Sequence, residues 1–168
     1  DDAEIIAVVA NNEVSETASV GDEVSVFLDR TPFYAEMGGQ VGDIGVIKTN
    51  MGTVEVTDCI KVVGGKIAHI GSVVDGSIKV GEKASASYDV KNRLSISRNH
   101  SATHLLQKAL RDVLGTHIQQ AGSYVSADRL RFDFTHFTAM TAEEIRKVEN
   151  IVNEKIYESI DITACEKT

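Results

Sequence analysis

The first half of the chain carries its apolar residues in short runs that are separated by turns. The turns include Asn11-Asn12 and Gly64-Gly65, and the second pair has the two-residue form favoured in tight hairpins. Eleven of the 13 glycines lie in residues 1–90. This pattern predicts a small, mostly antiparallel β-barrel or sandwich of about six to eight strands. The apolar runs are residues 5–10, 24–28, 46–47, 54–56, 60–63 and 67–70.

After residue 90 the apolar period changes from strand-like runs to helical spacing. Apolar residues recur every three to four positions between Ser101 and Leu114, with Asn99 as a possible cap and Gly115 as a stop. The alternation of residues 129–134 then predicts a strand, after a shorter one at residues 124–125.

A second helix is predicted from the capping-box pattern Thr141-Ala-Glu-Glu144 to about Ser159. The fold class is therefore α+β. We divide it into a glycine-rich β-barrel in residues 1–92 and an α+β part in residues 93–168. No flexible linker separates the two, so they are expected to pack together.

The composition is that of an ordinary soluble domain, but its charge is unevenly distributed. The 168 residues carry 17 Lys+Arg and 25 Asp+Glu, a formal net charge of −8. Residues 1–90 hold 6 basic and 15 acidic side chains, residues 91–136 hold 7 and 3, and the remainder hold 4 and 7. Four of the five histidines lie in the basic segment, which could meet a polyanion, although such segments also arise by chance.

No stretch approaches the roughly 20 apolar residues of a membrane span. The two cysteines form no paired motif, which fits a reducing, cytoplasmic location. The chain opens on Asp1 rather than Met, and we expect it to be a piece of a longer protein.

His100 and His104 lie four residues apart within the first predicted helix. At about 100° per residue they project roughly 40° from each other, near enough for both imidazoles to reach one metal ion. The apolar residues centre on the opposite side, which disfavours a buried pair, whereas two solvent-facing histidines without a role stay an alternative. Ser101 stands where a zinc protease of this spacing needs a glutamate base. Zinc takes three or four protein ligands, and the further candidates by residue type alone are Cys59, His69, His117, His136 and Cys165.

Two loops carry further candidate groups. Gly38-Gly39 supplies backbone that can approach a ligand closely, with polar Glu36 and Gln40 beside it, although a tight turn explains the glycines as well. Residues 115–123 offer neutral donors for a polar substrate, and the arginines that follow could hold phosphates. An ordinary helix-to-strand connection is the alternative there.

The order of these features resembles the editing domain of alanyl-tRNA synthetase over nearly the whole chain. A looser similarity extends to freestanding alanyl-tRNA editing proteins and to the accessory domain of threonyl-tRNA synthetase. Tyr34-Ala35-Glu36 favours the synthetase among these. The resemblance is carried by residues 28–43, which include Pro32-Phe33-Tyr34 and Gly38-Gly39-Gln40, by Asn99 to Leu106, by residues 115–123 and by Leu130-Arg131-Phe132-Asp133-Phe134.

The resemblance implies hydrolytic proofreading, in which serine or glycine wrongly attached to tRNA(Ala) is removed. ATP and Mg²⁺ would act only in the aminoacylation domain of the parent ligase. The partner is expected to be the acceptor end of tRNA(Ala). The implied residues are His100 and His104 as zinc ligands, Thr103 and Gln120 as catalytic polar groups, Glu36, Gly38, Gly39 and Gln40 around the substrate, and Arg98, Arg129 and Arg131 on the tRNA.

The chain departs from the family at the metal site. In that family a later Cys-x3-His motif completes the zinc site, and no such motif occurs in these 168 residues. We expect a domain cut before its metal site closes, with little or no activity in isolation. Met37 stands where serine is more usual. The alternatives are a freestanding trans-editing protein, an independent zinc hydrolase and a non-catalytic tRNA-binding module.

Overall fold

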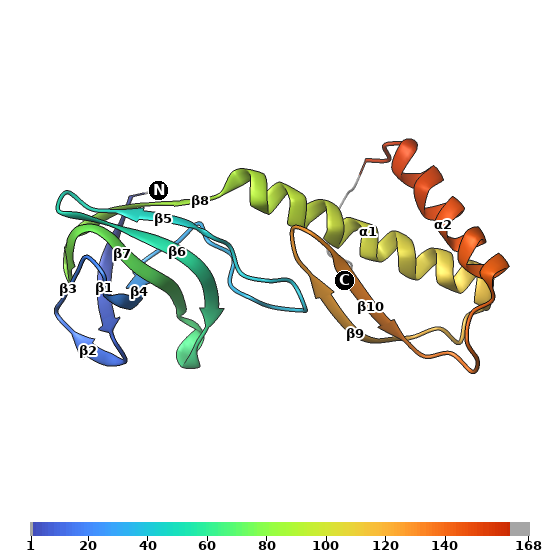
Figure 1. The fold of residues 1–168 in the computed structure, drawn as a ribbon, viewed down its shortest axis with the longest axis horizontal. Coiled ribbons are helices and arrows are strands. Elements are labelled where there is room, and N and C mark those ends of the chain that lie inside the picture. Colours follow the sequence, from blue (N-terminus) through green and yellow to red (C-terminus); the bar gives the residue numbers. More distant parts are fainter. Residues whose placement is uncertain (1, 162–168) are drawn as a thin grey trace, which may run out of the picture.

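The computed structural model describes residues 2–161. They form a β-sheet part and an α+β part, and one long helix leads from the first part into the second (Figure 1). This mixed α+β composition confirms the predicted fold class. The strands of the first part are β1 (Asp2–Ala10), β2 (Glu13–Ser15), β3 (Thr17–Ser19), β4 (Glu23–Leu28), β5 (Gly45–Lys48), β6 (Gly52–Lys61), β7 (Ile67–Lys79) and β8 (Lys83–Tyr88). A short 3-10 turn, Val63–Gly65, precedes β7. The second part consists of α1 (Val90–Leu114), β9 (Gln120–Val125), β10 (Leu130–Phe134) and α2 (Ala142–Tyr157).

All strand pairs of the first part are antiparallel. The main path runs β1, β4, β7, β6, β5, β8, and β8 pairs back with β1, so each of these six strands has two neighbours. The short strands β2 and β3 pair with β1 and β7. The ring of strands encloses an apolar core in which Ile5, Val26 and Val54 are fully buried.

The apolar runs located most of these strands, but two details differ. The separate runs at residues 54–56 and 60–63 fall largely within the single ten-residue strand β6, whose register shifts between Val56 and Asp58. Strand β8 contains no large apolar residue before Tyr88, because its buried positions are filled by Ala84 and Ala86. Its burial therefore left no apolar run in the sequence.

Helix α1 begins eleven residues before the predicted start at Ser101. Its cap is Asp89, whose side chain accepts from the backbone N–H of Asn92 at 2.9 Å. The expectation that Asn99 caps the helix is therefore wrong. Asn99 lies inside α1, and its side-chain amide donates to the carbonyls of Ser126 and Ala127. The predicted division after residue 92 falls within the first turn of this helix.

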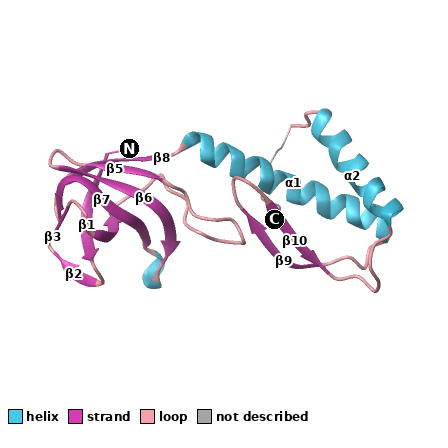
Figure 2. Cartoon of the chain, in the orientation of Figure 1, coloured by secondary structure: helices cyan, strands magenta, loops and turns pink. Residues whose placement is uncertain are grey.

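The second half of α1 packs between the β9–β10 hairpin and α2 (Figure 2). Their contact forms a second core, whose buried members are Ala109, Leu110, Ile118, Phe132 and Val148. The capping box predicted at Thr141 and Glu144 is present at the start of α2. In residues 2–161, no helix combines the length and apolarity needed to cross a bilayer.

Candidate functional site

The two helix histidines lie side by side on α1. Their ring centroids are 5.5 Å apart and the ring planes meet at 25°. His100 is half-buried, whereas His104 is exposed. The four-residue spacing therefore presents two imidazoles toward one region of solvent, as the sequence predicted.

The segment that faces them is the loop between β4 and β5. Gly38 and Gly39 adopt positive φ angles of 62° and 85°, which turn the chain so that Met37 and Gln40 exchange backbone hydrogen bonds. The loop then lies along β9: the N–H of Val125 donates to the carbonyl of Gly39 at 2.7 Å. A Cβ atom at Gly39 would overlap the carbonyl of Ser123, so this close approach requires glycine.

Gln40 connects the loop to the helix. Its Oε1 atom lies 2.6 Å from Nδ1 of His100, although 60 residues separate the two in sequence. Its backbone forms a parallel bridge with Val125 at the end of β9. The Gly-Gly-Gln turn, the end of β9 and the histidine face of α1 therefore meet at one place.

An ion pair fixes the base of this loop to the beginning of α1. Asp43 is 1% exposed, and its carboxylate accepts from the N–H of Tyr34 at 2.6 Å and from Nε and Nη2 of Arg93. Arg93 also donates to the carbonyl of Pro32 at 2.8 Å and lies over the ring of Tyr88. The hydrogen bond with Asp43 raises the pKa of Arg93. Sequence reasoning missed this pair, because no local spacing relates residues 50 positions apart.

The two expected catalytic groups, Thr103 and Gln120, do not contact the Gln40–His100 pair through any hydrogen bond among the described residues. Thr103 is buried, and its hydroxyl donates to the carbonyl of Asn99 at 3.0 Å, so its proton is already used within α1. Gln120 is exposed at the start of β9, at the opposite end of that strand from Val125. At about 3.3 Å per residue, roughly 10 Å of strand separates Gln120 from Ser123, against which Gly39 of the turn packs.

The remaining expected contact residues are exposed. Glu36 is fixed only through its backbone N–H, which donates to the carbonyl of Cys59. Arg98 donates to Ser95 on its own helix. Arg129 lies over the ring of Tyr124, and Arg131 pairs with Asp133 on the outward face of β10. The arginines thus surround the hairpin without forming one tight cluster.

The other metal-ligand candidates do not reach the helix pair. Cys59 and His69 are paired opposite each other in strands β6 and β7 and are fully buried. His117 and His136 form a separate pair, with Nε2 and Nδ1 2.9 Å apart. Cys165 lies outside the described residues. Within residues 2–161, no group of three metal-ligating side chains comes together.

Both ring nitrogens of His69 have partners. Its Nδ1–H donates to the carbonyl of Val26, which leaves Nε2 to accept from the hydroxyl of Thr31 at 2.7 Å. Burial lowers the pKa of His69. Burial also raises the pKa of Cys59 to about 12, with a contribution from the nearby carboxylate of Asp43. Both groups are therefore structural members of the first core.

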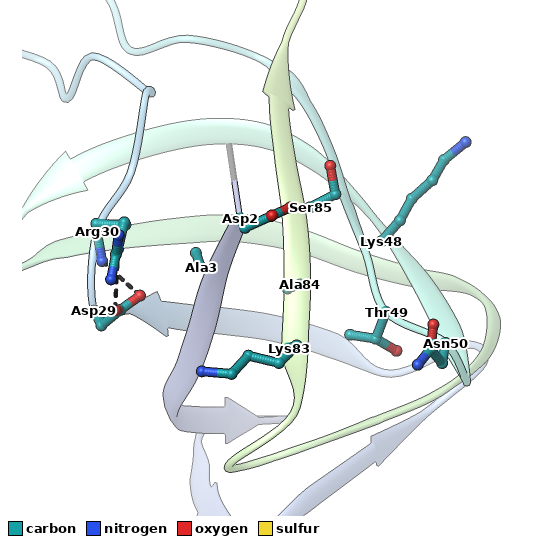
Figure 3. A pocket seen from close by; sticks show the side chains of 10 residues that line it. All are labelled: Asp2, Ala3, Asp29, Arg30, Lys48, Thr49, Asn50, Lys83, Ala84 and Ser85. Atoms are coloured by element: carbon teal, nitrogen blue, oxygen red, sulfur yellow. Dashed lines mark hydrogen bonds and ion pairs between the residues drawn. The ribbon is translucent and has the colours of Figure 1, made fainter.

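A hollow of about 630 Å³ lies elsewhere, on the outside of the first sheet between β1, β8 and the β5–β6 turn (Figure 3). Arg30 pairs there with Asp29, Lys83 pairs with Glu4, and Lys48 points away from the other lining side chains. No histidine or cysteine lines it. This hollow therefore contains none of the expected metal ligands.

Comparison with known proteins adds to this geometry. Residues 1–92 match the sequence model described as tRNA synthetases class II (A), which covers more than half of the chain. The chain belongs to this class II synthetase family. The alanine-tRNA ligase of Acetivibrio thermocellus is 54% identical over 160 residues, which is 95% of this chain and 18% of that protein. The alanine-tRNA ligases of Thermoanaerobacter sp. strain X514 and Bacillus velezensis are 49% and 46% identical, over 99% and 96% of this chain and 19% and 18% of their own lengths.

The similarity to alanyl-tRNA synthetase expected from the motifs is thus confirmed. The chain spans less than a fifth of the length of these class II synthetases. The region matched to the family, residues 1–92, contains the Gly-Gly-Gln turn and ends in the first turn of α1. The two helix histidines lie beyond it, in the stretch that the ligases also match.

Proposed function

We propose that this chain carries the hydrolytic editing site of an alanine-tRNA ligase, which removes serine and glycine from mischarged tRNA(Ala). One observation carries the proposal. The Gly-Gly-Gln turn places Gln40 against His100, from which it is separated by 60 residues in sequence, and the imidazole of His104 lies beside that of His100. The polar side chain of Gln40 and two potential metal ligands therefore share one surface.

The chemistry of discrimination supports such a site. Serine exceeds alanine by one hydroxyl, and an apolar synthetic pocket rejects an added hydroxyl by only about 100-fold. A second site that hydrogen-bonds the hydroxyl and hydrolyses the ester would add selectivity. The amide of Gln40 and the exposed carboxylate of Glu36 lie on the loop that faces the histidines. They are the proposed groups for orienting the substrate.

The two imidazoles fit a zinc site in residue type and spacing, but they supply only part of a ligand set. Zinc takes at least three protein ligands, and no third ligand joins this pair within residues 2–161. We propose that His100 and His104 hold the ion together with groups outside the described residues. When bound, zinc supplies polarisation of an ester carbonyl or of a water molecule. The isolated 168-residue chain is expected to retain zinc weakly.

The proposed tRNA contact is the basic segment around α1 and the hairpin. Residues 91–136 hold seven basic and three acidic side chains, in contrast to the acidic first sheet. Arg98 and Arg129 are exposed and form no ion pair with a carboxylate among the described residues. They are available to phosphates of the acceptor end.

The test is deacylation of pre-formed Ser-tRNA(Ala) by the full-length ligase that contains this chain. His100→Ala and His104→Ala should each slow hydrolysis by about 100-fold or more, the rate equivalent of losing roughly 3 kcal/mol of stabilisation. Alanine attachment to tRNA(Ala), which belongs to the aminoacylation domain, should be unchanged. His136→Asn, in the other histidine pair, is the matched control and should hydrolyse normally. Unchanged hydrolysis in both helix variants would favour a non-catalytic tRNA-binding module instead.

The isolated 168-residue chain provides a second arm. It should deacylate Ser-tRNA(Ala) far more slowly than the full-length ligase, because its described residues hold only two of the proposed ligands. Equal rates would show that further ligands are dispensable.

A further inference from the structure

The side chain of Gln40 makes a directed contact with one nitrogen of His100. Oε1 of Gln40 lies 2.6 Å from Nδ1, within hydrogen-bond distance, and both side chains are partly buried. A carbonyl oxygen can only accept, so with Oε1 facing the ring this hydrogen bond is made by the tautomer that carries its proton on Nδ1. Nε2 of the neutral ring is then left with a free lone pair.

The position of Gln40 is set by the backbone on both sides of it. Met37 and Gln40 exchange N–H···O bonds of 3.1 and 3.2 Å, and Val41 donates to the carbonyl of Val125 at 3.1 Å. The hydroxyl of Tyr34 donates to the carbonyl of Met37, which closes the turn from the other side. Few backbone rotations are free to move Gln40 away from the helix.

The partner ring is equally constrained, because His100 and Arg93 belong to the same helix. Arg93 forms the ion pair with buried Asp43, at the end of the loop that contains Gln40. Loop and helix are therefore fixed to each other independently of the Gln40 contact. The hydrogen bond forms between two pre-positioned groups rather than by chance approach of two mobile side chains.

His104 differs from its neighbour. Its ring is exposed and stacks with the ring of His100, and within residues 2–161 it has no hydrogen-bond partner. Of the two imidazoles, only that of His100 has a hydrogen-bond partner among the described residues. Supporting acceptors of this kind commonly fix the ring orientation of metal-binding histidines.

We infer that Gln40 is a positioning residue that holds His100 in the Nδ1–H tautomer and directs Nε2 toward the space beside His104. The consequence for metal binding rests on the proposed function, whereas the tautomer itself does not. If the amide were reversed, its NH₂ group would donate to Nδ1 and the ring proton would move to Nε2. That arrangement would block coordination through Nε2.

The first experiment measures the tautomer in the metal-free 168-residue chain by ¹⁵N NMR of the imidazoles. The pH is set well above the ordinary histidine pKa of about 6.5, because the two tautomers are forms of the neutral imidazole. His100 should carry its proton on Nδ1 in the wild type and in Gln40→Glu, which keeps an acceptor oxygen. Gln40→Met has similar length and no acceptor, and should lose this preference. Gln119→Met, at an exposed glutamine just before β9, is the matched control for the glutamine-to-methionine change.

A wild-type ring protonated on Nε2 would overturn the inference, as would the same Nδ1–H preference in Gln40→Met. The backbone amide spectrum checks that each variant is folded. If Gln40→Met does not fold, the wild type and Gln40→Glu still decide, since both must show the Nδ1–H form.

The second experiment titrates Co²⁺ into the same four proteins and follows its visible absorption. Gln40→Met should bind about 10 to 100-fold more weakly than wild type, as expected for loss of a supporting hydrogen bond, and Gln40→Glu should retain binding. Equal Co²⁺ affinity in wild type and Gln40→Met would overturn the positioning role. Loss of editing in the helix-histidine variants is measured separately on tRNA, so failure of the proposed function is distinguishable from failure of this inference.

Discussion

Replacing Arg93 by methionine tests whether the loop is held to α1 by a buried ion pair. The variant keeps an apolar stem of similar length and removes the only cation that faces Asp43 among the described residues. The carboxylate of Asp43, which is 1% exposed, would retain one donor, the N–H of Tyr34 at 2.6 Å. A buried charge would be left with most of its partners missing.

The expected loss of folding free energy in Arg93→Met depends on how deeply the two side chains of the ion pair are buried. Removing one partner of a fully buried pair costs about 3–5 kcal/mol. The Arg93 side chain is 28% exposed and Asp43 only 1%, so water can enter where the guanidinium was. We therefore expect a loss of about 2–4 kcal/mol, which includes the contact with the ring of Tyr88.

Urea unfolding of the 168-residue chain measures this loss. Lys147→Met, which removes an exposed pair with Glu143 on α2, is the control and should give no resolvable change. Adding Asp43→Asn to Arg93→Met should recover part of the loss, because the unpaired charge is then gone. An Arg93→Met variant within about 0.5 kcal/mol of wild type would refute the reasoning, since surface substitutions fall in that range.

Three further outcomes are expected. Burial lowers the pKa of His69, so at pH values below about 6.5 the unfolded chain binds a proton that the folded chain does not. Urea titrations should therefore show that the free energy of unfolding decreases as the pH is lowered from about 6.5, with a contribution from His69 of at most roughly 1.4 kcal/mol per pH unit. Stability that rises between pH 6.5 and about 5 would contradict this. Burial raises the pKa of Cys59 to about 12, so peptide mapping should find it unlabelled by iodoacetamide until urea is added, and rapid native labelling would be inconsistent with that. Gly38→Ala and Gly39→Ala both place a side chain where the backbone has positive φ, but only the Cβ of the Gly39 variant would overlap the carbonyl of Ser123. Gly39→Ala should therefore be the less stable variant in urea. Equal stabilities would speak against the close approach of Gly39 to β9.

The sequence predicted the fold where burial leaves a periodic apolar trace. Strand β4 buries Val24, Val26 and Leu28 at alternate positions, and the capping box marks the start of α2. The first turns of α1 left no such trace, because only Ile96 is buried before Thr103. The apolar spacing therefore predicts a start at Ser101, whereas the helix is capped by Asp89.

The sequence predicts the individual residues of the candidate site better than it predicts the contacts between them. The spacing of His100 and His104 fixes their shared helix face, and the glycine pair indicates a close backbone approach. The contact of Gln40 with His100 depends on how the loop packs along β9, which no local pattern encodes. Thr103 illustrates the same limit, because its hydroxyl turns back onto the carbonyl of its own helix.

The central claim is that the surface shared by His100, His104 and Gln40 removes the wrong amino acid from tRNA(Ala). The most direct measurement is the amount of Ser-tRNA(Ala) that accumulates when the full-length ligase is given serine, ATP and tRNA(Ala). The account predicts little accumulation with the wild type and strong accumulation with the His100→Ala, His104→Ala double variant, at an unchanged rate of alanine attachment. Equal, low accumulation in both proteins would contradict it.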